Sequence, residues 1–237
     1  MKAQVYKDPR PAEHFAVFHA RTRTRRPDWV YEAVRLLLTP YLLLFYRARC
    51  IDSGNLPADG PVIIAPNHFS FLDHFFVAVY LRRKVHFMAK SQMFKPPLQV
   101  IYTHGGVFPV RRGHADEEAF KTAHAVLARG DVVVMYAEAG RSRTGELGKP
   151  RHGLGRLALE SGAPILPTAI AGTERARNWK RLQFPKVTVQ FGEPIKFERV
   201  RSMHGRLRTE GRRSAVKAAR AARRAAEATG RRPLSVD

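Results

Sequence analysis

Short apolar runs rich in β-branched residues recur along the chain from Gly60 onward. Six of them have the length and composition of buried strands, namely residues 61–66, 84–89, 106–110, 131–137, 163–170 and 186–192. Between some of these runs, apolar residues recur at helical spacing, over residues 69–81, 116–130 and 153–162. Strands that alternate with helices predict an α/β fold, with a largely parallel mixed sheet flanked by helices.

An apolar segment near the N-terminus covers residues 34–49, and its uninterrupted part is residues 36–46. This part is shorter than the roughly 20 residues that cross a bilayer. Arginines flank it and aromatic residues stand at its ends, a pattern typical of helices that lie in a membrane interface. We expect an N-terminal interfacial helical segment here, and an ordinary helix docked on the core is the alternative.

The C-terminal tail has alanine as almost its only apolar residue, so it buries too little area for a core helix. Four basic residues fall on one helical stripe: Arg213, Lys217, Arg220 and Arg224. We expect a basic C-terminal helix that binds anionic lipid, with nucleic-acid binding and a merely solvated helix as alternatives. We therefore expect three regions: an N-terminal region with the apolar segment over 1–50, an α/β domain over 51–200 and a basic helical tail over 201–237.

The whole chain of 237 residues carries a formal charge of +22. Such a balance predicts polyanionic partners, among which nucleic acid, anionic lipid head groups and phosphorylated substrates all qualify. A single cysteine, Cys50, excludes an intrachain disulfide framework and a thiolate metal cluster. The first 15 residues lack the apolar stretch of a signal peptide, which predicts an unprocessed N-terminus.

A histidine and an aspartate five residues apart, His68 and Asp73, interrupt the apolar pattern after the first predicted strand. Histidine, with an unperturbed pKa near 6.5, accepts a proton readily at neutral pH, and a carboxylate on its other nitrogen fixes the tautomer. Ser70 is a candidate N-cap for the following helix, with Asp73 answering it as in a capping box. One helical turn would then bring the carboxylate back to the imidazole. In isolation, however, the spacing equally describes a capped helix beside a structural histidine.

Arginines follow two other predicted strands. Arg111 and Arg112 come after residues 106–110, while Glu138, Arg141 and Arg143 come after 131–137. Guanidinium groups present paired donors to phosphate oxygens, and the carboxyl ends of parallel strands meet at one edge of a sheet. These loops therefore predict a phosphate-binding site near His68.

Four blocks, taken together, resemble the glycerolipid acyltransferases typified by 1-acylglycerol-3-phosphate (lysophosphatidate) acyltransferase. "NHFSFLD" resembles the family's Asn-His-x4-Asp block, "GVFPVRRG" the second block, and "AEAGRSRTG" the Glu-Gly-Thr-Arg-Ser block, while "APILP" is similar to the fourth. The blocks occur in the family's order over roughly residues 60 to 170. In the third block, Ala139 and Gly140 replace the family's Gly-Thr, which removes a hydroxyl near the acceptor phosphate and leaves the acceptor's identity open.

The resemblance implies O-acyl transfer from acyl-CoA, or from acyl carrier protein, to the free hydroxyl of 1-acylglycerol-3-phosphate, making phosphatidate for phospholipid synthesis. It implies His68 and Asp73 as the catalytic pair, with backbone N–H groups at the start of the next helix as candidates for holding the oxyanion. It implies substrate-binding roles for Asn67, Arg111, Arg112, Glu138, Gly140, Arg141 and Ser142. We expect neither a metal nor a cofactor beyond the thioester co-substrate.

Three other functions remain as alternatives. An acyltransferase acting on another lysolipid or hydroxylated acceptor is the nearest of them, and a thioesterase would have little use for a phosphate site. A basic nucleic-acid-binding protein is more distant, because the chain has no ribonucleoprotein, zinc-finger or basic-zipper motif. We expect no nucleic-acid partner, and we expect a protein held on an anionic membrane surface, peripheral or monotopic on the cytoplasmic face of the cell membrane.

Overall fold

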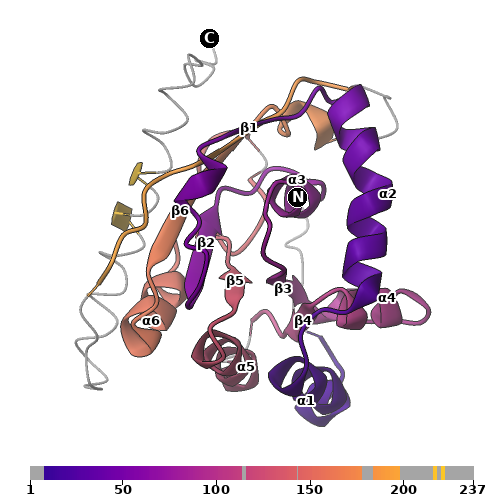
Figure 1. The fold of residues 1–237 in the computed structure, drawn as a ribbon. Helices are drawn as coiled ribbons and strands as arrows, with labels where there is room; N and C mark the ends of the chain where they lie inside the picture. The colour runs from indigo at the N-terminus through magenta and orange to yellow at the C-terminus, as the bar shows by residue number, and fades with distance from the viewer. Residues whose placement is uncertain are drawn as a thin grey trace.

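A computed structural model of the protein describes residues 8–113, 116–142, 144–177 and 184–197, together with 216, 217, 220 and 221. These residues form a seven-stranded sheet in the order β1-β7-β6-β2-β5-β3-β4 (Figure 1). The strands are β1 Arg49–Ile51, β2 Val62–Pro66, β3 Val85–Lys90, β4 Val107–Val110, β5 Val132–Val134, β6 Ile165–Ala171 and β7 Thr188–Phe191.

The sheet is mixed and largely parallel, as predicted. β2 pairs in parallel with both β5 and β6, and β3 pairs in parallel with β4 and β5. Only the pairing of β6 with β7 is antiparallel among the named strands, and β1 runs parallel to β7 at the sheet edge. All six predicted strands are present. Because β2, β5, β3 and β4 pair in parallel, their carboxyl ends lie at the same end of the sheet.

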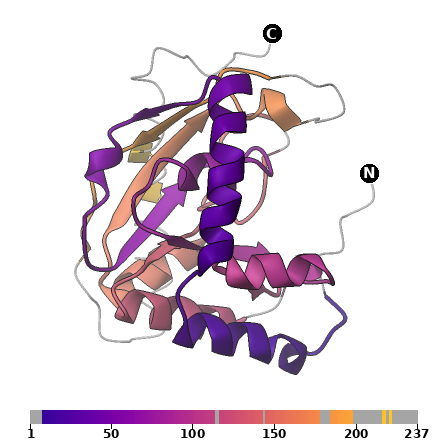
Figure 2. The same ribbon diagram turned by 45° about the vertical axis from the view of Figure 1, so that its right-hand side comes forward.

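Helices cover both faces of the sheet. α1 Ala16–Thr24, α5 Glu117–Ala128 and α6 His152–Ser161 lie on one face, while α2 Trp29–Phe45 and α3 Asp73–Ala78 lie on the other (Figure 1). α4 Leu98–His104 contacts α2 and lies beside one end of it (Figure 2). Short 3-10 turns occupy Ala12–Phe15, Ser53–Asn55, Ser91–Met93 and Arg175–Arg177.

Neighbouring residues of β2 face opposite layers, as the pleat of a strand requires. Val62 and Ile64 pack in one cluster with α2 and α3, whereas Ile63 and Ala65 pack in the other with α5 and α6. All four are at least 96% buried, since the largest exposed fraction among them is 4% at Ala65. A strand covered on both faces reads as a continuous apolar run, and this explains why its sequence was recognisable.

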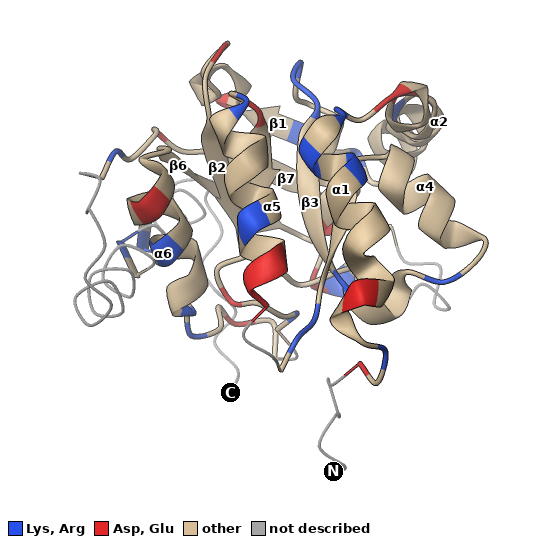
Figure 3. Ribbon diagram, turned by 90° about the horizontal axis from the view of Figure 1, so that it is seen from below, with Lys and Arg blue, Asp and Glu red and all other residues tan. Residues whose placement is uncertain are grey.

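Charged residues of both signs lie on the helical layer formed by α1, α5 and α6 (Figure 3). Arg23 of α1 pairs with Glu118 of α5, and Arg156 of α6 pairs with Glu117 of α5 at 2.9 Å. These ion pairs join helices that are distant in sequence. Because the side chains are partly exposed, each contributes only modestly to stability.

The predicted N-terminal apolar helix is present as α2, which continues through Pro40. One of its faces is buried through Tyr31 and Leu42, while Leu36, Leu37 and Leu44 are about three-quarters exposed, at 76%, 74% and 76%. No helix among the described residues combines the length and apolarity that crossing a membrane demands. Whether this exposed face contacts a membrane stays a prediction.

Element boundaries differ most from the sequence prediction at α3 and β5. The helix predicted over 69–81 begins only at Asp73 and ends at Ala78, and β5 ends at Val134 instead of residue 137. β1, α1 and α4 were not predicted. β1 spans the expected domain boundary at residue 50, although the division into three regions stays a prediction. Most of the basic tail lies outside the described residues, and its four described residues are helical.

Candidate active site

The loop after β2 begins with an asparagine that is bonded to a neighbouring strand. The Asn67 side-chain amide donates to the Ile170 carbonyl at 2.9 Å, and its oxygen accepts from the Ile170 N–H at 2.7 Å. Both ends of the amide are therefore used in extending the β2–β6 pairing beyond Pro66. This geometry gives Asn67 a structural role at the start of the loop, and its expected substrate contact stays a prediction.

His68 and Asp73 lie in contact, as their spacing predicts. His68 Nδ1 is 2.9 Å from Asp73 Oδ2, and the same carboxylate oxygen accepts from the backbone N–H groups of Phe69 and Ser70 at 2.8 Å each. The Asp73 side chain is fully buried and His68 is 5% exposed. An ionised carboxylate only accepts, so Nδ1 carries the hydrogen and Nε2 keeps its lone pair. The pair can thus act as a general base.

The capping-box expectation for Ser70 and Asp73 is half right. Asp73 does reach back to the Ser70 N–H, but the Ser70 hydroxyl accepts from the Leu72 N–H at 3.3 Å, and the helix begins three residues after Ser70. The Phe69 and Ser70 N–H groups both donate to Asp73. Whether N–H groups at the start of the helix after His68 hold the oxyanion stays a prediction.

Two aromatic rings that sequence reasoning missed surround the His68 imidazole. Tyr136, two residues after β5, stacks on it with ring centroids 4.0 Å apart and an angle of 25° between the planes. His74 of α3 meets it edge-on at 5.4 Å. The strand predicted over residues 131–137 includes Tyr136, and no role is predicted for His74 from the sequence. Only the tertiary fold brings both rings to His68.

The loop after β5 is bonded directly to the His68 loop. The Ser142 N–H donates to the His68 carbonyl at 2.8 Å, which gives this substrate-binding candidate a backbone contact with the proposed base. Ala139 takes a left-handed conformation with φ of 57°, a region that residues with a Cβ rarely adopt. The loop therefore turns sharply between β5 and the site.

Glu138 lies half-buried within this loop. Burial raises its pKa to about 7, although the backbone N–H groups of Gly148 and His68 act in the opposite direction. A Cβ at Gly148 would lie 2.7 Å from Glu138 Oε2, so the two segments approach closely. By contrast, a Cβ at Gly140 would meet no neighbouring atom within 4 Å. The hydroxyl that the family carries there would have room in this chain.

The three described arginine candidates follow β4 and β5 at the same sheet edge as His68. The Arg111 backbone N–H donates to Asp116 at 2.6 Å, and both Arg111 and Arg112 are half-buried. Arg141 is exposed, and its charge is near enough to His74 to lower the pKa of that histidine, after the larger effects of burial and of His68. Arg143 lies outside the described residues. All three therefore follow strands whose carboxyl ends lie at the same end of the sheet, and their joint binding of a phosphate stays a prediction.

Comparisons with known proteins find similarity to acyltransferases. A family model described as Acyltransferase matches residues 47–171, which include the loops carrying His68, Arg112 and Arg141. The 1-acyl-sn-glycerol-3-phosphate acyltransferase BAT2 of Brassica napus is 29% identical over 133 residues, covering 54% of this chain and 38% of that protein. The corresponding enzyme of Cocos nucifera is 28% identical over 136 residues, with coverage of 55% and 44%.

A glycerol-3-phosphate acyltransferase of Pseudomonas aeruginosa is 27% identical over 48% of this chain and 14% of that protein. The chain spans less than half the length of these curated relatives. Among solved structures, PlsC of Thermotoga maritima, a 1-acyl-sn-glycerophosphate acyltransferase, has the same fold, with a TM-score of 0.61 and 21% identity over 93% of this chain and 91% of that one. Because the family model covers more than half of its residues, the chain belongs to the Acyltransferase family.

Proposed function

We propose that this protein transfers an acyl chain from a thioester to the free hydroxyl of 1-acylglycerol-3-phosphate. The observation that carries the proposal is the buried His68–Asp73 pair, with Arg111, Arg112 and Arg141 following strands at the same sheet edge. The base removes a proton and the arginines bind a phosphate, which together suit a phosphate-bearing lysolipid. Matching relatives from plants carry the name of this activity.

In the proposed reaction, His68 Nε2 takes the proton of the acceptor hydroxyl while the oxygen attacks the thioester carbonyl. The C–S bond of the resulting tetrahedral intermediate then breaks, and an ester and a thiolate are formed. The imidazolium releases its proton to the thiolate or to water, which returns His68 to its starting state. Asp73 stabilises the imidazolium through the bond to Nδ1.

General-base help of this kind accounts for about 100- to 10,000-fold of a rate enhancement, so positioning of the acceptor must supply more. The donor thiol is coenzyme A or acyl carrier protein, and both are proposals. An acyltransferase acting on a different acceptor is the second candidate. This second candidate is supported by the match to glycerol-3-phosphate acyltransferases, whose acceptor also carries a phosphate.

The test is an assay of purified protein with radiolabelled acyl-CoA and a panel of lysolipids and glycerol-3-phosphate. We expect acylation of 1-acylglycerol-3-phosphate, and a loss of at least about 100-fold in both His68→Ala and Asp73→Asn. His124→Ala is the matched control, because His124 pairs with Glu160 on the helical layer and its loss should leave turnover unchanged. Retention of more than about a tenth of wild-type turnover in His68→Ala would contradict the assignment of the base.

We further propose that the protein works as a peripheral protein on the cytoplasmic face of the cell membrane. The exposed leucines of α2 support this, and the adjacent helix α4 extends the apolar surface through Leu98, Val100 and Ile101, which are 50%, 56% and 45% exposed. Exposed apolar side chains on two helices in contact, on a strongly basic protein, suit an anionic bilayer.

A further inference from the structure

The imidazole of His68 has one bond that holds it in place and two rings that border it. The bond from Nδ1 to Asp73 fixes one atom of the ring. A single hydrogen bond tolerates a range of angles, so the imidazole can still swing about its Cβ–Cγ bond within that range. Tyr136 covers one face of the imidazole at 4.0 Å, and such a stacked contact restricts this rotation.

The Tyr136 ring is itself held firmly. It is 9% exposed and belongs to the core cluster under α3, and the Ala139 N–H donates to its carbonyl at 3.1 Å as the loop turns. Its hydroxyl is buried without a hydrogen-bond partner among the described residues. Among the described contacts, Tyr136 therefore acts on His68 through the face of its ring, and its hydroxyl takes no part.

His74 completes the surroundings from α3. Its Nδ1 lies 3.0 Å from the Phe71 carbonyl, to which it donates, and its ring packs on Tyr136 at 5.1 Å and on Phe87 of β3 at 5.4 Å. Tyr136 and His74 thus support each other as well as His68. Three elements, β3, α3 and the loop after β5, meet around one imidazole.

We infer that Tyr136 is a positioning residue that sets the plane of the His68 ring and so directs Nε2 toward the acceptor hydroxyl. This inference rests on the proposed function, in which His68 is the base. Small displacements of a reacting group are costly, since a shift of about 1 Å can lower a rate about 100-fold. An aromatic face also attracts a cation, so the ring favours the imidazolium that forms during the reaction.

Other groups around His68 also carry or exchange charge. Asp73 and His74 face it from α3, and Glu138 and Arg141 lie in the loop after β5. None of these four side chains is itself substituted in a Tyr136 variant, although His74 packs directly on the ring that is removed. A pH effect that appears in a Tyr136 variant and is absent from the control therefore reports the stacking ring.

The experiment compares Tyr136→Phe, which keeps the ring, with Tyr136→Leu, which removes it. We expect the kcat of Tyr136→Phe to stay within about two-fold of wild type, and that of Tyr136→Leu to fall about 10- to 100-fold with both KM values little changed. The midpoint of the acid limb of the kcat/KM profile should move to lower pH in the Leu variant, because the imidazolium loses its aromatic partner. Tyr31→Leu is the control, since Tyr31 is a buried tyrosine of α2 in the same core cluster.

A second measurement does not depend on turnover. In protein labelled with 13C-histidine, the His68 Cε1–Hε1 resonance can be assigned by its absence from His68→Ala. Its ring-current shift should persist in Tyr136→Phe and disappear in Tyr136→Leu, or in Tyr136→Met if the Leu variant does not fold. The inference would be overturned if the His68 resonance kept its wild-type position in the ring-deleted variant, or if Tyr136→Phe lost as much kcat as Tyr136→Leu. If wild type acylates no acceptor, the proposed function fails, and the resonance alone decides the position of the ring.

Discussion

Arg141 is the residue whose exposed position makes its assignment to the acceptor phosphate most testable. Arg141 comes after β5, at the same end of the sheet as His68, and its charge lies near His74. Arg141→Lys retains the charge but loses the planar pair of donors. Charge-assisted hydrogen bonds contribute about 1.5 to 3 kcal/mol each, so we expect the acceptor KM to rise about ten-fold or more. A two-substrate kinetic matrix with a phosphate-bearing lysolipid measures this.

The thioester KM is the internal control of that matrix and should change little. If it rises while the acceptor KM stays constant, Arg141 contacts the phosphates of coenzyme A. Arg35→Lys on α2 is the matched variant, because Arg35 bonds to the Leu81 carbonyl, beyond the end of α3 opposite Asp73, and should alter neither KM.

Ala139 holds a left-handed conformation where a residue with a Cβ is strained. Such a conformation costs about 1 to 2 kcal/mol, while glycine loses about 0.4 to 1 kcal/mol more backbone entropy on folding. Ala139→Gly should therefore raise the free energy of unfolding, by up to about 1 kcal/mol, in urea denaturation. Ala128→Gly, at an exposed position in α5, should lower it by about 0.5 to 1 kcal/mol. Equal destabilisation by both changes would contradict the strain.

At the residue scale, the sequence predicts contacts that are local and misses those that are not. His68 and Asp73 are five residues apart, so one turn of chain brings them together whatever the rest of the fold does. Tyr136 reaches His68 only because β5 pairs with β2 and ends at Val134. A run of apolar residues does not reveal where a strand stops, so the ring was assigned to a strand.

At the scale of elements, strands buried on both faces were predictable and helices held by polar contacts were not. α1 has few apolar residues, and it is fixed to α5 partly by the bond of His19 Nδ1 with Thr122 Oγ1 at 2.9 Å and by the pair of Arg23 with Glu118. β1 has only three residues and owes its conformation to β7. Neither leaves a periodic apolar pattern in the sequence.

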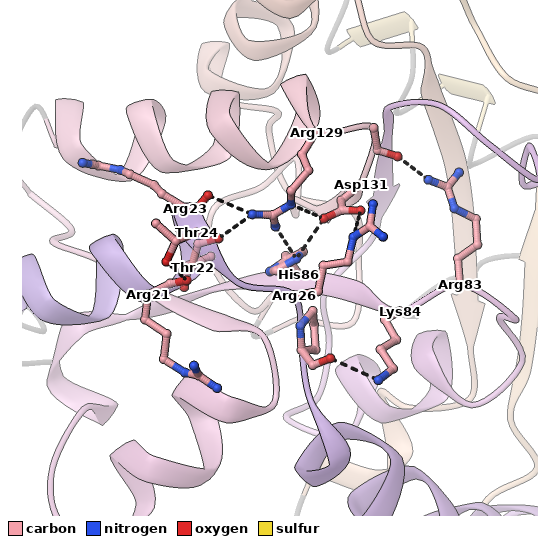
Figure 4. A network of polar contacts seen from close by, with 12 residues as sticks. Arg21, Thr22, Arg23, Thr24, Arg26, Arg83, Lys84, His86, Arg129 and Asp131 are labelled. Carbon is pink, nitrogen blue, oxygen red and sulfur yellow. Dashed lines mark hydrogen bonds and ion pairs between the residues drawn. The ribbon is translucent and has the colours of Figure 1, made fainter.

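A polar network joins α1, β3 and β5 at the sheet edge opposite the site (Figure 4). Arg129 Nε donates to Asp131 at 2.7 Å, its terminal nitrogens reach the Thr22 and Arg23 carbonyls, and it lies 3.3 Å from His86 Nε2. Arg129 thereby satisfies carbonyls at the end of α1, which have no partner within the helix. His86 is 1% exposed at the centre of this network.

Acid should weaken this network. Burial lowers the pKa of His86 below its ordinary 6.5, despite the opposing effect of Asp131. The unfolded chain therefore binds more protons than the folded one as pH falls through 6.5, so the stability is present above that pH and declines below it. We expect a lower free energy of unfolding at pH 5.5 than at pH 7.5 in urea denaturation.

His86→Gln is the variant that isolates this effect, because glutamine does not titrate in the range. The drop between the two pH values should shrink in it, while His124→Gln, on the more exposed face of α5, should keep the wild-type drop. His19, which is also buried with a lowered pKa, accounts for part of the remaining drop. An identical pH dependence in His86→Gln and wild type would exclude His86 as the group responsible.

At the scale of the whole molecule, the exposed apolar side chains and the net positive charge both favour binding to an anionic membrane. α2 and α4 are in contact and both expose apolar side chains, whereas the layer of α1, α5 and α6 carries charges of both signs (Figures 2 and 3). The net charge of +22 adds attraction to anionic lipid that salt would screen. Two components of membrane binding can therefore be separated, one sensitive to salt and one not.

Leu37→Glu tests the component that does not depend on salt. Leu37 is 74% exposed on α2, so its replacement should leave the fold intact while removing apolar area from the surface proposed to enter the membrane. Burying a leucine is worth about 1.5 to 3 kcal/mol, which predicts at least about ten-fold weaker binding to anionic vesicles in flotation assays at both low and high salt. Ala128→Glu adds the same charge on the opposite face of the sheet and should weaken binding only slightly, and chiefly at low salt. If both variants weaken binding equally and only at low salt, charge alone attracts the protein to the membrane and α2 does not enter the interface.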